Sequence, residues 1–228
     1  MRYFLRVMKN SDFGKAEKLM TDFNESGFLF SYIRFMNLSP QGGSIDFYVG
    51  NTLVCAGIKF GSYSPYIKTA SSDQVYKATR SGRKDDVIDK ITLSQDIGKV
   101  HSLCVCGMAD EAKFLPVEEP MPQSVKGYGN LRICNFSPGS KSFDIWANRE
   151  KILEDINYKE QSIYMNIKPE IYNFSLSQNG SESKKLGECE IKADKFYSLY
   201  IIGTKNEMPH LSGIFTLDAA SYSGFYLL

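Results

Sequence analysis

The 228-residue sequence has few histidines, a side chain often used in acid–base catalysis and metal binding. It contains two histidines and one tryptophan, and its formal net charge is only +1. A chain so close to neutral has no basic footprint, which argues against nucleic acid as a partner. No stretch reaches the ~18 consecutive apolar residues of a membrane helix, so membrane insertion is not expected either. No catalytic signature stands out either, so we expect no enzymatic activity and no cofactor.

A secretory signal is also missing from the N-terminal decapeptide, Met1 to Asn10. The segment starts like the charged region of a signal peptide, but Arg6 and Lys9 interrupt its apolar part. No small-residue cleavage site follows. We therefore expect the chain to be made in the cytoplasm without a signal peptide.

The cysteines are odd in number and irregular in spacing, which argues against a disulfide framework. Most are expected to be small apolar core residues. Cys104 and Cys106 share one face of a predicted strand and could cross-link to another chain in an oxidising exterior. His101 points to the opposite face, so the three side chains cannot form a zinc site without a bulge. The five cysteines are Cys55, Cys104, Cys106, Cys134 and Cys189.

What the sequence does contain is one pattern written twice. Six residues recur in the same order 98 positions later (34 to 132). A repeat of this length fits two small domains better than a solenoid unit. The first copy has Arg34, Asn37, Ser39, Pro40, Ser44 and Asp46, and the second has Arg132, Asn135, Ser137, Pro138, Ser142 and Asp144.

Short alternating runs rich in aromatic residues, separated by turn residues, favour β structure in both copies. The spacing of these runs predicts an all-β chain made of two tandem immunoglobulin-like antiparallel β-sandwich domains with a short N-terminal extension. The predicted parts are an extension at 1–29 (a strand plus a short helix), a first sandwich at 30–117, a proline-containing linker at 118–126, a second sandwich at 127–217 and an apolar tail at 218–228.

The charged residues shared by both copies are the pairs Arg34/Asp46 and Arg132/Asp144. They could form a ligand site, or an internal bridge that ties adjacent strands together. Both copies keep them within a strand–loop–strand unit, which favours the internal bridge. The asparagine before each Ser-Pro is suited to cap its loop by accepting a hydrogen bond from a main-chain N–H.

Five aromatic residues invite two interpretations. They could form a sugar-binding surface, or they could be core residues and contacts between the two domains. We favour the second interpretation. The residues are Tyr48, Tyr63, Tyr66, Trp146 and Tyr164.

The repeated element, followed by Ile45-Asp46-Phe47-Tyr48 or Phe143-Asp144-Ile145-Trp146, resembles the bacterial domain-of-unknown-function family 4397. Late strands ending at Gly107 and Gly203 strengthen the resemblance. The glycine usual before the fourth-strand tyrosine is missing from both copies, so the chain is a divergent member. The resemblance implies a β-sandwich, often at a cell surface, and no reaction. It also implies similarity to signal-less proteins of spore coats and spore appendages.

The leading hypothesis is a non-enzymatic structural subunit that assembles with copies of itself, and with other surface-layer proteins, into a layer or fibre on a spore. The alternative is a surface binding or adhesion module that recognises a glycan or a protein.

Two terminal segments outside the repeats are predicted to be strands that assist assembly. At the N-terminus Tyr3, Leu5 and Val7 lie on one face, and at the C-terminus Phe225 and Leu227 share a face opposite Tyr222. Edge strands of a sandwich offer unpaired main-chain groups to which such a segment can add. Head-to-tail addition does not close, so it would make fibres. The alternative is that both segments fold back onto their own domains.

Overall fold

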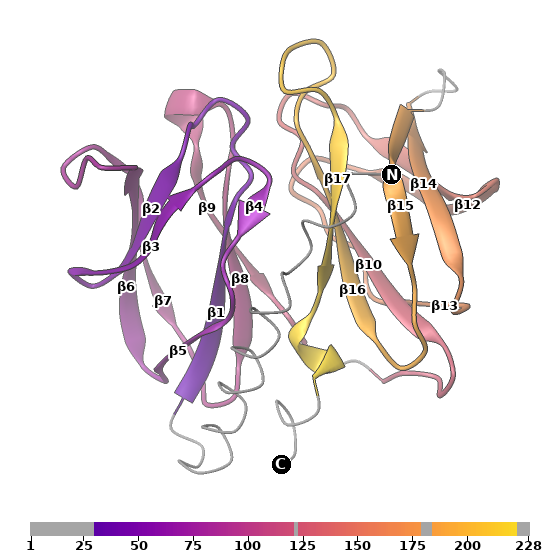
Figure 1. Ribbon diagram of the computed structural model, residues 1–228, viewed down its shortest axis with the longest axis horizontal. Helices are drawn as coiled ribbons and strands as arrows, with labels where there is room; N and C mark the ends of the chain where they lie inside the picture. The colour runs from indigo at the N-terminus through magenta and orange to yellow at the C-terminus, as the bar shows by residue number, and fades with distance from the viewer. Residues whose placement is uncertain (1–29, 121–122, 179–183, 223–228) are drawn as a thin grey trace. The chain divides into compact units, whose positions relative to one another are not determined.

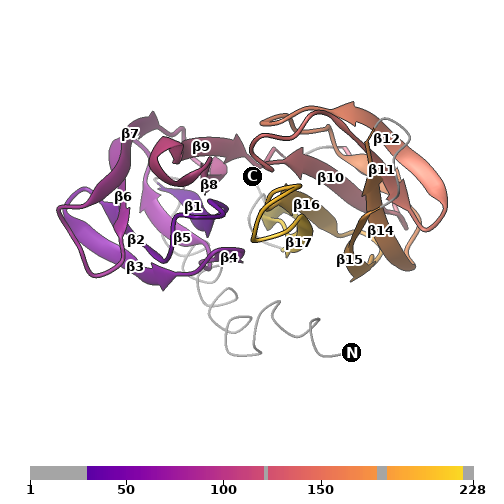
Figure 2. The same cartoon turned by 90° about the horizontal axis from the view of Figure 1, so that it is seen from above.

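The computed structural model describes residues 30–120, 123–178 and 184–222 (Figure 1). They form two compact units that divide between Met121 and Pro122. Each unit is a sandwich of two β-sheets, and the view from above shows the two sheets of a unit as separate layers (Figure 2). The predicted all-β fold with two tandem sandwiches is therefore confirmed. The predicted strand and helix at 1–29 lie outside the described residues.

In the first sandwich one sheet has the order β3-β2-β6-β7 and the other has the order β4-β1-β8-β9, with β5 also paired to β1. A short 3-10 helix, η2, precedes β9. The bounds are β1 Phe30–Asn37, β2 Ile45–Val49, β3 Thr52–Ile58, β4 Ser62–Tyr63, β5 Ile67–Ala70, β6 Asp73–Arg80, β7 Val87–Ser94, β8 Val100–Cys106, η2 Ala109–Glu111 and β9 Lys113–Glu118.

The second sandwich repeats this plan, with sheets ordered β12-β11-β14-β15 and β13-β10-β16-β17. A last 3-10 helix, η3, follows β17. The bounds are β10 Gly129–Asn135, β11 Phe143–Ala147, β12 Glu150–Ile156, β13 Met165–Ile167, β14 Ile171–Ser177, β15 Lys184–Glu190, β16 Phe196–Ile202, β17 Ser212–Leu217 and η3 Ala219–Ser221. No helix in the described ranges is long and apolar enough to cross a membrane.

Along each strand, successive side chains alternate between the core and the outer face of the sandwich. In the first sandwich Ile33 and Phe35 point inward from β1 and meet Phe47, whose ring stacks on Phe35 with centroids 4.8 Å apart. In the second sandwich Phe174 plays the same central part, with the ring of Phe215 at 5.2 Å. Aromatic burial of this kind supplies much of the hydrophobic stabilisation of a small sandwich.

One strand pair in each sandwich differs from the predicted antiparallel arrangement. Strand β1 runs parallel to β8, and β10 runs parallel to β16, with Arg34 opposite Ser102 and Arg132 opposite Ser198. The partners are distant in sequence because the chain passes through the other sheet between them, and parallel strands need such a long connection. Local patterns predict strands but not which strands become neighbours.

The last strand of each sandwich and the residue that follows it include positions that the sequence pattern assigned to the linker or the tail. Strand β9 tolerates Pro116 because it lies at a sheet edge, where a missing N–H costs little. It includes Glu118, and Glu119 beyond it is buried. After β17, Asp218 is completely buried. The start of the expected linker and of the expected tail therefore belong to the folded sandwiches.

Candidate functional site

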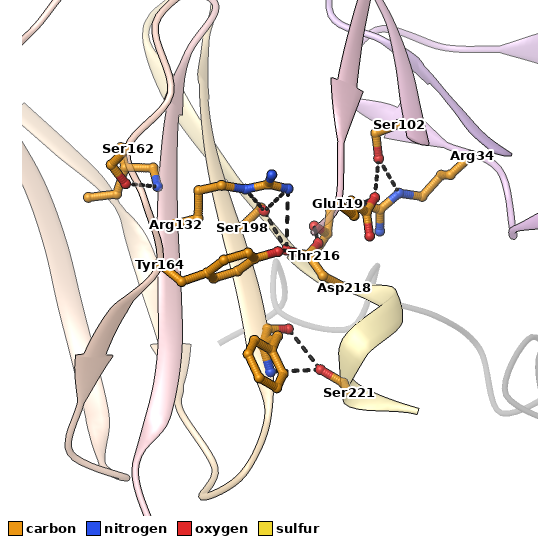
Figure 3. A network of polar contacts seen from close by, with 12 residues as sticks. Arg34, Ser102, Glu119, Arg132, Ser162, Tyr164, Ser198, Thr216, Asp218 and Ser221 are labelled. Carbon is orange, nitrogen blue, oxygen red and sulfur yellow. Dashed lines mark hydrogen bonds and ion pairs between the residues drawn. The ribbon is translucent and has the colours of Figure 1, made fainter. Parts of the chain in front are cut away.

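A buried polar network surrounds Arg34 of β1 in the first sandwich (Figure 3). Its Nε donates a hydrogen bond to Ser102 Oγ at 3.0 Å, and its Nη2 lies 2.9 Å from Glu119 Oε1. Ser102 donates to the same carboxylate at 2.6 Å. The Tyr66 hydroxyl also donates to Glu119, and its ring lies 4.8 Å from the guanidinium carbon of Arg34. Every member is buried, so the network holds strands together and is closed to a ligand.

The second sandwich contains the same network, built around Arg132 (Figure 3). Arg132 Nε donates to Ser198 Oγ at 3.0 Å, and the Tyr164 hydroxyl donates to Asp218 Oδ2 at 2.7 Å. The carboxylate is an aspartate, which is one methylene shorter than Glu119, so its distance to Arg132 Nη2 increases to 3.6 Å. Thr216 donates to the other carboxylate oxygen at 2.9 Å.

The predicted bridges from Arg34 to Asp46 and from Arg132 to Asp144 are wrong. Arg34 alternates with core residues of β1 and points out of its sheet. Asp46 alternates with core residues of β2, which belongs to the opposite sheet, and points out on the other side. Strands that are consecutive in sequence thus place these side chains on opposite faces of one sandwich, and the same holds in the second.

Asp46 and Asp144 instead hold a bulge in the neighbouring edge strand. Asp46 accepts hydrogen bonds from the N–H groups of Gly57 at 2.7 Å and Gly82 at 2.9 Å. Burial raises the pKa of Asp46, but these hydrogen bonds outweigh it and hold that pKa below its ordinary value. Asp144 accepts from the N–H of Asp155 at 3.2 Å. Gly57 and Asp155 occupy equivalent positions, and both have positive φ, +66° and +50°.

The asparagines of the motif cap their loops as the sequence predicts. The Oδ1 of Asn37 accepts a hydrogen bond from the N–H two residues later at 3.3 Å, and that of Asn135 does so at 3.1 Å. Their amide groups also donate to the carbonyls of Ile58 and Ile156, at 2.9 and 3.0 Å. Each asparagine thereby connects its own loop to the end of the edge strand in the other sheet.

The motif serines close the opposite side of each loop. Ser39 Oγ donates to the carbonyl of Gly107 at 2.8 Å, and Ser137 Oγ donates to that of Gly203 at 2.8 Å. Gly203 has φ +83°, and an added Cβ would lie 2.3 Å from a backbone oxygen of His210, so only glycine fits there. The prolines that follow the serines, Pro40 and Pro138, are buried.

The five aromatic residues considered for sugar binding have separate roles. Tyr63, Tyr66 and Tyr164 lie over the buried arginines, with Tyr63 5.4 Å from the guanidinium carbon of Arg34. Tyr48 is 6% exposed. The indole N–H of Trp146 donates to Ser177 Oγ at 3.0 Å, and the ammonium of Lys151 lies over its ring. These internal contacts favour the interpretation as structural residues.

The cysteine cross-link predicted for Cys104 and Cys106 is not available in the folded chain, because these residues are 0% and 3% exposed. The Sγ of Cys104 lies 3.7 Å from the sulfur of Met36. His101 is also buried and points to the core side of β8, as expected. Among the described residues no group of three or more metal-binding side chains gathers.

An open groove lies at one edge of the second sandwich. The two edge strands on one side, β15 and β17, approach so closely that a Cβ at Gly213 would be 3.2 Å from the carbonyl oxygen of Leu186. On the other side, β12 and β13 end their sheets (Figure 1) and border a cavity of 270 Å³. Its lining is Leu131, Ile152, Met165 and Ile167, with Glu150, Lys151 and Asn166 at the polar parts.

The charged side chains at the rim of this groove partly neutralise one another through ion pairs. Lys151 lies 3.1 Å from Asp144 Oδ2 and 3.1 Å from Glu154 Oε1. The hydrogen bond from Lys151 lowers the pKa of Asp144, and the same bond raises the pKa of Lys151. Ile163, which shortly precedes β13, is 84% exposed. The edge therefore presents apolar surface next to unpaired strand edges.

Comparison with protein families decides the classification. The family described as Domain of unknown function (DUF4397) matches residues 31–140 and again residues 129–221. The chain belongs to this family. Its two DUF4397 domains correspond to the two sandwiches, which agrees with the resemblance seen in the sequence.

Other comparisons show only distant likeness to the DUF4397 pair. A search of curated proteins finds no match. The C-terminal domain of AlgF from P. aeruginosa is 17% identical with a TM-score of 0.33, over 41% of this chain and all of that one. CBMbc (family CBM26) from Eubacterium rectale Amy13K, solved with maltoheptaose, is 12% identical with a TM-score of 0.28, over 85% of this chain and all of that one. A protein of Bacteroides uniformis whose description refers to cell adhesion is 10% identical with a TM-score of 0.27, over 84% of this chain and 97% of that one. Scores this low carry no argument about function.

The carboxylates of the two networks, Glu119 and Asp218, are the site residues that sequence reasoning missed. Sequence spacing could not have found them, because Glu119 lies 17 residues after Ser102 whereas Asp218 lies 20 residues after Ser198. Their equivalence appears only in the strand register, in which each carboxylate lies two residues beyond the partner of the network serine. Of the predicted assembly residues, Tyr222 is half-buried, and the others lie outside the described part of the chain.

Proposed function

We propose that the chain is a non-enzymatic binding and assembly protein, in which the second DUF4397 domain binds an extended apolar polypeptide segment along the edge formed by β12 and β13. The observation that carries the proposal is the cavity between these two edge strands, with its apolar floor of Leu131, Ile152, Met165 and Ile167. The recurring arginine, asparagine, aspartate and Ser-Pro serine support a non-enzymatic role, since each is used in an internal network or to hold a loop or bulge.

Strand addition suits the chemistry of this edge. An incoming strand would pair its main chain with an edge strand and place alternate side chains in the groove. A cavity of 270 Å³ falls below the range of about 300–1,000 Å³ typical of small-molecule pockets. It opens at a sheet edge, which is accessible to a peptide along its whole length. A polypeptide is therefore the better ligand class.

The setting is part of the same proposal. A protein with two sandwiches and an open edge is suited to be a repeating subunit of a surface layer or fibre, and the resemblance of the sequence points to the spore surface. Adhesion to another protein through the same edge is the related alternative. Immunogold labelling of spores and vegetative cells of the source bacterium tests the setting, and label confined to the cell interior would contradict it.

Hydrogen exchange tests the binding function directly. Peptides of alternating apolar and polar residues, added to the full chain, should slow amide exchange in β12 or β13 and leave β15 and β17 unchanged. Met165→Glu, which places a charge in the groove, should abolish this protection. Val87→Glu is the matched control, because Val87 is a 48% exposed apolar residue on β7 of the first sandwich. Protection that is absent, or that persists in Met165→Glu, would contradict the proposal.

A further inference from the structure

None of the described residues fills the groove in the second sandwich. The side chains that line the groove restrict which ligands can bind there. The floor is formed by apolar side chains from both sheets, Leu131 and Met165 on one side and Ile152 on the other. Alternate residues of a strand are ~6.6 Å apart and lie on one face, so a strand can place several side chains on such a floor. The occupant should therefore be a strand with apolar side chains on one face.

The charge of the edge adds a second requirement. Within β12 there are three acidic residues, Glu150, Glu154 and Asp155, and one basic residue, Lys151. The lysine is already paired with Asp144 and Glu154. Glu154 remains 72% exposed. An approaching strand with basic side chains on its outer face would complement this edge, and one with acidic side chains would be repelled.

The first residues of this same chain have both properties. Tyr3, Leu5 and Val7 alternate with Arg2 and Arg6. The first eleven residues contain two arginines and one lysine and no acidic residue. The segment precedes β1 by more than twenty residues, which gives it reach beyond the first sandwich.

We infer that residues 1–8 of one copy bind as an added strand in the β12–β13 groove of a second copy, with Tyr3, Leu5 and Val7 toward the apolar floor and Arg2 and Arg6 toward the acidic edge. This inference rests on the proposed function and names its partner. Donor segment and acceptor groove belong to different parts of the chain, so each copy can accept one neighbour and donate to another. Such a contact is head-to-tail and propagates into a fibre unless it closes into a ring.

The experiment uses the full chain, a variant lacking residues 1–10, and a labelled peptide of residues 1–10. The full chain should form concentration-dependent assemblies by light scattering and negative-stain microscopy. The truncated chain should stay monomeric while its circular dichroism is unchanged. The peptide should bind the truncated chain saturably by fluorescence anisotropy, and it should block assembly of the full chain in excess.

Paired variants identify the contact. Leu5→Asp in the peptide and Met165→Glu in the truncated chain should each weaken binding by at least about tenfold, as expected for loss of an apolar anchor. Val87→Glu should bind as the unmodified chain does. Met165→Ala is a milder groove variant for use if Met165→Glu does not fold. Added salt should weaken binding, because opposite charges face each other.

Each result has a defined meaning. Normal assembly of the truncated chain would overturn the inference, as would a peptide that does not bind. A full chain that stays monomeric while the isolated peptide binds the truncated chain would show that the segment occupies its own groove, which overturns the role of a second copy. If other alternating peptides protect β12 or β13 but residues 1–10 do not bind, the inference fails and the proposed function stands. If no peptide protects this edge, both fail.

Discussion

Arg34 and Glu119 form a buried ion pair, 2.9 Å apart, across 85 residues of sequence. The arginine lies on the first strand of its sandwich, and the glutamate directly follows the last one. Their side chains are 2% and 1% exposed, so solvent cannot stabilise either charge if the other residue is removed. The pair joins the beginning and the end of one folded unit, and Arg132 and Asp218 do the same in the other.

Loss of one partner of this pair should destabilise the first sandwich. Arg34→Met leaves the Glu119 carboxylate buried without its cation, at a cost of about 3–5 kcal/mol. The second sandwich should keep its stability. Hydrogen exchange, followed separately for the two sandwiches during thermal unfolding, measures both effects. The double variant Arg34→Met/Glu119→Leu should recover part of the loss.

The surface pair Lys99–Glu118 provides the matched control for that experiment, since its side chains are 46% and 45% exposed. Lys99→Met should cost no more than about 1 kcal/mol, because exposed pairs contribute little. An Arg34→Met variant no less stable than Lys99→Met would show that the buried pair is unimportant to the fold.

The first sandwich should lose stability in mild acid because of His101. Burial lowers the pKa of His101 below its ordinary value, although Glu118 and Glu119 act to raise it and Lys99 adds to the lowering. The unfolded chain therefore binds a proton at higher pH than the folded chain does. The contribution of neutral His101 is complete above the unfolded pKa of about 6.5 and is lost as the pH falls through the lower, folded pKa.

The chain contains a natural control for this effect. In the second sandwich the position equivalent to His101 is Tyr197, since the two face Ile33 and Leu131 in the same register. His101→Tyr should remove the acid-dependent loss of stability in the first sandwich. Thermal unfolding across a pH series below neutrality measures this loss. An unchanged pH profile in this variant would assign the acid sensitivity to other groups.

At still lower pH, Asp46 should contribute a further acid-dependent loss of stability in the first sandwich. Its folded pKa lies below the unfolded value because it accepts main-chain hydrogen bonds from Gly57 and Gly82. Its stabilisation is present above an unfolded pKa of about 3.9 and is lost as the pH falls through the folded pKa. Asp46→Asn should show a smaller loss than the unmodified chain over that range. Equal losses would mean that the hydrogen bonds do not depend on the charge.

Thiol labelling should separate the cysteines by exposure. Cys55 is half-buried, whereas Cys104, Cys106, Cys134 and Cys189 are buried. We expect Cys55 to be labelled first, and slowly, because burial raises its pKa and reduces the thiolate fraction. The others should react only on unfolding. Any disulfide-linked dimer on a non-reducing gel should disappear in Cys55→Ser. A dimer that survives this substitution would point to opening of a buried strand.

Much of the fold could be predicted from local patterns. Alternation of apolar residues marked strands such as β1 and β2, and the repeat from Arg34 to Asp46 identified two domains. The capping of each loop by Asn37 or Asn135 was also predictable, because an Asx turn needs only its own neighbouring backbone. These features depend on contacts a few residues apart, or on comparison of the chain with itself.

The sequence alone therefore determined that the chain is all-β, duplicated and capped at Asn37 and Asn135. Only the tertiary structure decided that Arg34 faces Glu119 and not Asp46, and that the second sandwich is closed at β15–β17 and open at β12–β13. The physical reason is that β1 and β2 enter different sheets although they are consecutive in sequence, so Arg34 finds its partner 85 residues away, after the last strand of the sandwich. Which sheet edges meet depends on the packing of both layers together, as at Gly213 against Leu186, and no local pattern encodes it.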